Sequence, residues 1–98
     1  MATPETITTD IISFIEEKGG RTLDWYVGIT SNPEQRLFAE HGLQKTGEDW
    51  IYRTADTAEE ARRIGKYFVV AVKTDGAGFN EANARTVYAY KKKEHTKP

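Results

Sequence analysis

Short segments typical of β-strands alternate with helical segments along this sequence, and this alternation most restricts the possible fold. The strand segments are rich in aromatic and β-branched residues, and the helical segments carry apolar stripes. We predict the order αβαβαβ, with helices at 9–18, 31–40 and 58–72 and strands at 23–30, 50–54 and 85–91. Each helix must bury its apolar stripe. The pattern therefore predicts an α+β fold in which a small three-stranded antiparallel-type sheet is covered by three helices.

Residues with strong turn preferences mark the ends of these elements. Thr8 or Thr9 can cap the first helix, and the glycines at 19–20 end it. Pro33 suits the first turn of the second helix. Residues 74–78 combine an aspartate with two glycines, so we expect a loop there.

Length and composition predict a single domain over residues 1–98, with a basic tail at 92–98 that we expect to be disordered. Ninety-eight residues are close to the common domain size, and 38% of them are hydrophobic. No apolar run approaches the roughly 20 residues of a membrane span, and the N-terminus lacks the pattern of a secretory signal. Cysteine is absent, which excludes disulfides and thiolate metal sites. We therefore expect a cytoplasmic protein without a membrane partner.

Charge is divided unevenly between the two halves of the chain. Residues 1–50 carry four Lys or Arg against nine Asp or Glu, a net −5, and residues 51–98 carry ten against six, a net +4. This asymmetry is compatible with one basic face that contacts a phosphate backbone. The alternative is an ordinary solvated surface with a basic tail.

The most specific motif begins at Tyr26. The predicted strand contains Tyr26-Val27-Gly28, Thr30 follows two positions later, and the next helix places Arg36 ten residues after the tyrosine. This arrangement resembles the second half of the motif that defines the GIY-YIG endonucleases. The strand at 50–54 and the Thr-x-Glu-Glu-Ala helix opening at 57–61 also resemble that family.

The first half of the GIY-YIG motif, a Gly-Ile-Tyr strand, is missing upstream of Tyr26, where a helix is expected instead. Thr86-Val87-Tyr88 is a candidate for that strand, and it could pair with the Tyr26 strand from the C-terminal side. We therefore expect a circularly permuted version of the fold, which is feasible because chain termini often lie close together.

The resemblance implies hydrolysis of phosphodiester bonds in DNA, with Mg²⁺ as the cofactor. It implies that Tyr26 takes part in proton abstraction from the nucleophile and that Tyr88 is a second catalytic tyrosine. Arg36 would stabilise the charge that grows on the phosphoryl oxygens, because a guanidinium matches two phosphate oxygens. The residues expected to bind the substrate are Gly28, Thr30, His41, Lys66 and Asn80.

The metal-binding glutamate of the family falls at Gly65, four residues after Ala61. Glycine inside a helix costs about 1 kcal/mol relative to alanine, so it needs a reason such as close packing or a lost carboxylate. Glu59 and Glu60 point elsewhere on a helix of 3.6 residues per turn. We therefore expect metal-dependent cleavage to be impaired or absent.

Each of these residues also has a purely structural interpretation. Tyr26 could pack its ring on the sheet, and Tyr88 could belong to an aromatic packing pair. Arg36 could be a surface residue of its helix, and Asn80 a turn residue. His41 could simply interact with the dipole at the end of a helix.

Three functions are compatible with the sequence: a nuclease, a nucleic-acid-binding module that does not cleave, and a protein-interaction domain on the same fold. Salt-dependent DNA binding separates the first two from the third, and cleavage separates the first from the second. The sequence lacks a Gly-x-Ser-x-Gly motif and a phosphate-binding loop.

Overall fold

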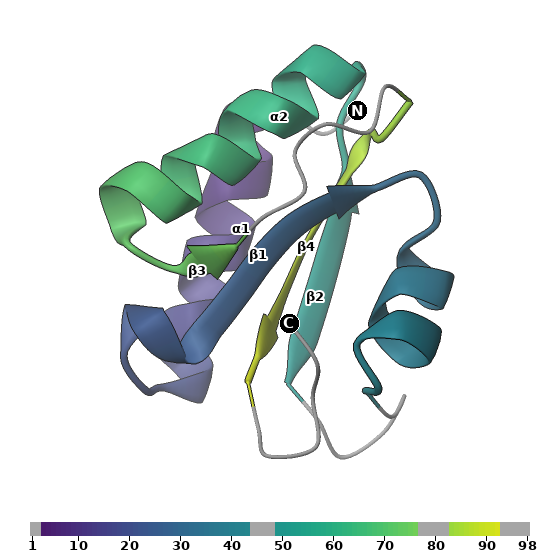
Figure 1. Cartoon of the computed structure of the whole chain (residues 1–98). Helices are drawn as coiled ribbons and strands as arrows, with labels where there is room; N and C mark the ends of the chain where they lie inside the picture. The colour runs from purple at the N-terminus through teal and green to yellow at the C-terminus, as the bar shows by residue number, and fades with distance from the viewer. Residues whose placement is uncertain (1–2, 44–48, 77–82, 93–98) are drawn as a thin grey trace.

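A four-stranded mixed sheet forms the centre of the molecule, with helical segments on both of its faces (Figure 1). The computed structural model describes residues 3–43, 49–76 and 83–92. Along the chain the elements are α1 (Pro4–Lys18), η1 (Thr22–Asp24), β1 (Trp25–Thr30), η2 (Gln35–Glu40), β2 (Trp50–Thr54), α2 (Ala58–Tyr67), η3 (Phe68–Val72), β3 (Asp75–Gly76) and β4 (Thr86–Lys91). The expected α+β class is confirmed. None of the helices in these ranges is long and apolar enough to cross a membrane.

β4 lies inside the sheet although it comes after the other three strands in the sequence. The strand order is β2-β4-β1-β3, and β4 runs antiparallel to both β1 and β2. The register places Tyr88 opposite Gly28 on one side and opposite Tyr52 on the other. The expected pairing of the C-terminal strand with the Tyr26 strand is therefore confirmed.

The expectation of three strands is wrong by one short strand. Asp75 and Gly76, which we expected in a loop, form β3 and pair in parallel with Tyr26 and Val27, so the sheet is mixed. A Cβ atom at Gly76 would collide with the carbonyl oxygen of Val27, so glycine lets the two backbones approach closely. Two residues carry too weak a strand pattern to be recognised without their partner.

One face of the sheet is aliphatic and packs against α1 and α2. Because side chains alternate along a strand, Trp25, Val27 and Ile29 of β1 all point to this face. This core also contains Ile7, Ile11, Ile15, Ile51, Ala61, Ile64, Phe68, Val87 and Ala89. It anchors both long helices to the same side of the sheet.

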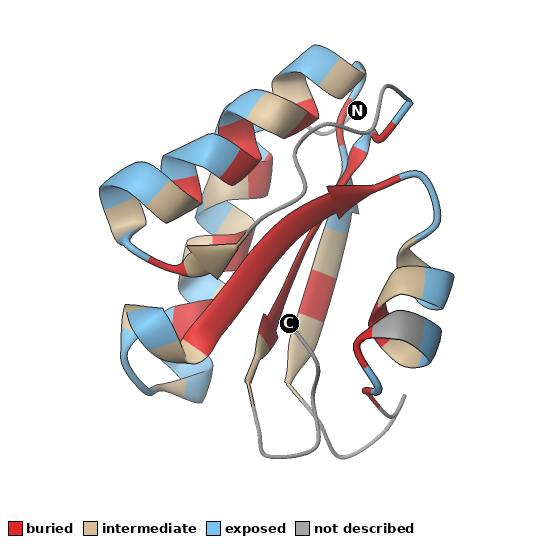
Figure 2. Cartoon of the chain, viewed as in Figure 1, coloured by how far each residue is buried: buried red, intermediate tan, exposed pale blue. Residues whose placement is uncertain are grey.

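The opposite face is aromatic and is covered by η2. Tyr26, Tyr88 and Tyr90 form a second core there with Leu37 and Leu43. With a core on each side, β1 is buried along its whole length (Figure 2). The two faces thus differ in chemistry: mainly aliphatic side chains, with Trp25 and Phe68, hold the helices, and phenols lie under η2.

The first helix begins earlier than we expected. The Thr3 hydroxyl accepts a hydrogen bond from the backbone N–H of Thr6 at 3.1 Å, so Thr3 is the cap and Pro4 lies in the first turn. The apolar stripe continues back to Ile7, one turn before Ile11, which explains the earlier start.

The other expected elements are found close to their predicted bounds. β2 covers residues 50–54, and β4 covers 86–91. The last helix is capped by Thr57 and continues through η3 to Val72. The second helix differs in its winding, because the His41 N–H donates to the carbonyl of Arg36, five residues earlier.

Candidate functional site

Four side chains with polar atoms meet beneath η2, and we call Tyr26, His41, Tyr88 and Tyr90 the aromatic cluster. Tyr26 and Tyr90 are opposite each other in β1 and β4, and Tyr88 lies on the same face two residues before Tyr90. The centroid of the Tyr26 ring lies 5.0 Å from that of His41, 5.3 Å from that of Tyr90 and 6.3 Å from that of Tyr88. Three residues predicted from the sequence, Tyr26, His41 and Tyr88, are thus brought together.

His41 connects η2 to β4 through both of its ring nitrogens. Its Nε2 atom lies 2.8 Å from the Tyr88 hydroxyl, and its Nδ1 atom lies 3.1 Å from the Tyr90 hydroxyl. The His41 side chain is buried. Its role is therefore more specific than an interaction with the end of a helix dipole.

Gly28 makes room for the Tyr88 phenol. A Cβ atom at position 28 would lie 2.5 Å from the Tyr88 hydroxyl oxygen and 2.6 Å from the ring carbon that carries it. The phenol of Tyr88 therefore extends from β4 across the backbone of β1. Gly28, predicted to bind the substrate, here has a structural role that any side chain would disturb.

Arg36 and Thr30 belong to the connection that carries the chain over the aromatic face. Arg36 precedes Leu37, a member of the second core, and its Nε atom is buried. Arg36 therefore lies in the element that covers Tyr26, on the same side of the sheet. The Thr30 hydroxyl accepts a hydrogen bond from the Asn32 N–H at 3.0 Å, so Thr30 shapes the turn between β1 and η2.

Two further predicted positions lie in α2, outside the aromatic cluster. Lys66 is exposed in the last turn of this helix. Gly65 is buried beside Ala61 and Ile64, which belong to the aliphatic core. Asn80, the remaining predicted site residue, lies outside the described residues.

The residues do not fit the Mg²⁺ site that the family resemblance implies. Glycine offers no ligand at position 65, and in the described ranges no three His, Asp or Glu side chains gather as metal ligands. Asp75, which pairs with Tyr26 in the sheet, is held by Lys92, with Nζ 3.0 Å from Oδ2. The donor set of this chain therefore gives no support to a metal-dependent step.

Charges at the edge of the sheet act on the aromatic cluster. Burial raises the pKa of Tyr90 above its ordinary value, and the nearby Tyr26 and Asp75 raise it further. The hydrogen bond from Lys92 lowers the pKa of Asp75 below 3.8, although burial opposes the shift. At neutral pH, Tyr90 is therefore protonated and Asp75 is ionised.

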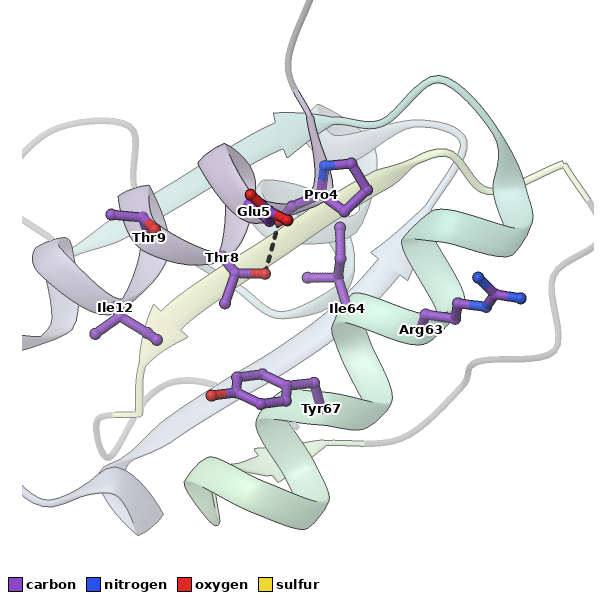
Figure 3. Close-up of a pocket in the computed structure, with 8 residues that line it drawn as sticks. All are labelled: Pro4, Glu5, Thr8, Thr9, Ile12, Arg63, Ile64 and Tyr67. Atoms are coloured by element: carbon purple, nitrogen blue, oxygen red, sulfur yellow. Dashed lines mark hydrogen bonds between the residues drawn. The ribbon is translucent and has the colours of Figure 1, made fainter.

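A groove between α1 and α2 is a second place where a ligand could bind (Figure 3). It has a volume of about 420 Å³, and the Tyr67 ring lies over its apolar wall. Two of its polar side chains are already engaged, because the Thr8 hydroxyl donates to the Pro4 carbonyl and Arg63 pairs with Glu59. The aromatic cluster brings four polar side chains into mutual contact, so it is the stronger candidate.

Sequence reasoning gave Tyr90 no functional role. Its hydroxyl bonds to Nδ1 of His41, which lies 49 residues away in the sequence. The Tyr-x-Tyr spacing of β4 already predicts that Tyr88 and Tyr90 share a face. Nothing local indicates that a histidine would lie between their hydroxyl groups.

Comparison of this chain with protein-family models, with curated proteins and with solved structures found no match.

Proposed function

We propose that this chain is a GIY-YIG-like domain that binds the phosphodiester backbone of DNA and is impaired in metal-dependent hydrolysis. The observation that carries the proposal is the place of β4, which lies antiparallel to β1 with Tyr88 opposite Gly28. A circularly permuted GIY-YIG fold needs this pairing, because its Gly-Ile-Tyr strand would come last in the sequence.

Arg36 is the residue proposed to contact a phosphate. It lies in η2, which covers the face that carries Tyr26 and Tyr88. A guanidinium keeps its charge at all relevant pH values and can bond two phosphate oxygens at once. This placement supports a phosphate contact at the rim of the aromatic cluster.

Two observations favour binding without turnover. Position 65 is glycine, so α2 supplies no carboxylate there. The two proposed catalytic phenols are also closed off from solvent, with Tyr26 7% exposed and Tyr88 2% exposed. A phosphodiester could reach either oxygen only after the surrounding side chains had moved.

Fluorescence anisotropy with a labelled DNA duplex at low salt tests the binding. We expect Arg36→Ala to weaken binding by roughly tenfold, because one charge-assisted contact is worth about 1.5 kcal/mol or more. Arg21→Ala is the matched control, because the Arg21 side chain is 86% exposed and lies at the other end of β1. Equal affinities of the two variants, or no binding at low salt, would count against the proposal and favour a protein-interaction domain.

Nicking of supercoiled DNA with Mg²⁺ tests the impairment. We expect no cleavage by the unaltered chain, because position 65 is glycine and the Tyr26 and Tyr88 phenols are buried. Gly65→Glu should stay inactive as well, since Gly65 lies beside the aliphatic core, on the face of the sheet opposite to those phenols. Strong nicking by the unaltered chain would show that the glutamate is not required.

A further inference from the structure

When the His41 ring is neutral, its two hydrogen bonds run in opposite directions. A neutral imidazole has one N–H donor and one acceptor nitrogen. Both nitrogens of His41 are engaged, Nε2 with Tyr88 at 2.8 Å and Nδ1 with Tyr90 at 3.1 Å. One phenol therefore donates to the ring, and the other accepts from it.

Tyr90 is the phenol that donates. Its side chain is fully buried, and among the described residues the partner of its hydroxyl is His41 Nδ1. A buried hydroxyl that failed to donate there would keep an unsatisfied proton, which is costly. Burial also holds the phenol in its protonated form. These observations favour the arrangement in which the Tyr90 proton points at Nδ1 and the ring proton of His41 is on Nε2.

We propose that Tyr90 and His41 are positioning residues that direct the Nε2–H group of His41 onto the Tyr88 oxygen, so that Tyr88 is the phenol whose ionised form the cluster stabilises. The assignment rests on the two hydrogen bonds of His41 and on the burial of Tyr90. The catalytic meaning of Tyr88 rests on the proposed function, in which this phenol belongs to the phosphodiester site.

The groups around the cluster are consistent with a hydrogen bond donated by His41 Nε2–H to the Tyr88 oxygen. Tyr26 stacks beside both other tyrosines and brings no charge while it is protonated. Asp75 acts on Tyr90 from the edge of the sheet and favours its neutral form, while Lys92 balances the Asp75 charge. Arg36 carries a positive charge in η2, the helical segment that ends at His41 and covers the cluster.

Nitrogen-15 NMR of the histidine rings tests the assignment without nucleic acid. We expect His41 to show a protonated Nε2 and an unprotonated Nδ1 near neutral pH. The only other histidine in the sequence, His95, is identified from the spectrum of His95→Gln. Protonation of Nδ1 instead of Nε2 would overturn the proposal.

Two tyrosine variants distinguish the effects of Tyr88 and Tyr90 on the protonation of the His41 ring. Tyr90→Phe removes the donor to Nδ1, so we expect the two tautomers to become mixed. Tyr88→Phe leaves that donor in place, so Nδ1 should stay unprotonated. If Tyr90→Phe fails to fold, the Tyr88→Phe spectrum still decides the question, and a protonated Nδ1 there contradicts the proposal.

Ultraviolet titration tests the stabilisation of the Tyr88 phenolate. The contribution of Tyr88 to the titration curve is the difference between the curve of the unaltered chain and that of Tyr88→Phe. We expect His41→Gln to move that contribution to higher pH, and an unmoved titration would contradict the role of His41. Loss of DNA binding in the Arg36→Ala experiment concerns the proposed function only, so the two proposals fail separately.

Discussion

At Gly28, the absence of a side chain sets the position of the Tyr88 phenol. The hydroxyl oxygen of Tyr88 is held by His41 at 2.8 Å and lies directly over the β1 backbone. A ring fixed at its far end cannot move aside as easily as a flexible surface side chain. The residue is thus required by packing, whatever ligand the site takes.

We expect Gly28→Ala to lower the free energy of unfolding by about 1–3 kcal/mol, the usual cost of overpacking a tight site. Urea unfolding measures this change. In a Tyr88→Leu background the added methyl group no longer meets the phenol, so the cost of Gly28→Ala should fall. Equal costs in the two backgrounds would show that Tyr88 is not what excludes a side chain at this position.

Tyr90 should make the fold sensitive to alkaline pH. Its pKa is raised in the folded state, whereas an unfolded tyrosine ionises near pH 10. Below about pH 10 both states hold the proton, so stability is unaffected; above it only the unfolded state releases the proton, so stability falls as pH rises. We expect Tyr90→Phe to flatten this fall in urea unfolding measured from neutral to alkaline pH, and an unchanged slope would assign the effect to other tyrosines.

At the scale of elements, β2 presents an open edge. Asp49 and Ala55 bond to β4, so in an antiparallel ladder the backbone groups of Trp50, Tyr52 and Thr54 face away from it. Among the described residues no strand covers this side. The Arg53 guanidinium donates to the Tyr52 carbonyl at 2.8 Å and so occupies part of the edge.

We expect Arg53→Ala to increase self-association, because it uncovers a strand edge that a second copy can pair with. Sedimentation velocity over a range of protein concentrations measures this effect. Arg63→Ala is the control, since Arg63 is 76% exposed and pairs with Glu59 on α2, away from the edge. Similar sedimentation of the two variants would show that Arg53 does not guard β2.

Elements with a strong local pattern were predictable from the sequence, and those defined by a distant partner were not. β2 and the α2–η3 helix have clear periodicity and capping residues, and both are found as expected. β3 exists only because Asp75 and Gly76 meet Tyr26 and Val27 across the sheet. α1 begins earlier than predicted, although Thr3 and Pro4 form a local capping pattern in the sequence.

Three of the four members of the aromatic cluster were predicted from the sequence, but Tyr90 and the hydrogen bonds of the cluster were not. Tyr26, His41 and Tyr88 were expected from motif spacing, and the register of β4 on β1 brings them together. The link from Tyr90 to His41 depends on how η2 lies over the sheet, which no local pattern specifies. Gly28 was expected to contact a ligand, and only the fold reveals the phenol that lies over it.

At the scale of the whole molecule, the order of segments should matter less than their pairing. We expect a permuted chain that begins at Asn83, with the old termini joined by a flexible linker of about 12 residues, to fold with the same sheet. Such a linker spans up to roughly 40 Å when extended, more than the longest dimension of the molecule, 32 Å.

Circular dichroism and thermal unfolding of this permutant measure the outcome. A second permutant, opened between Tyr88 and Ala89, is the control, because it cuts the strand that both β1 and β2 pair with. We expect the first permutant to unfold cooperatively and the second to lack a folded baseline. Failure of the first permutant to fold would mean that β4 must follow β1 and β2 in the sequence.

The interior place of β4 also has a consequence during synthesis. β1 and β2 leave the ribosome earlier, yet neither pairs with the other, and each waits for the same later segment. Until that segment emerges, the nascent polypeptide exposes strand edges that invite aggregation. Chaperone dependence and cotranslational losses should therefore be greatest for this protein just before the final segment of its sheet is translated.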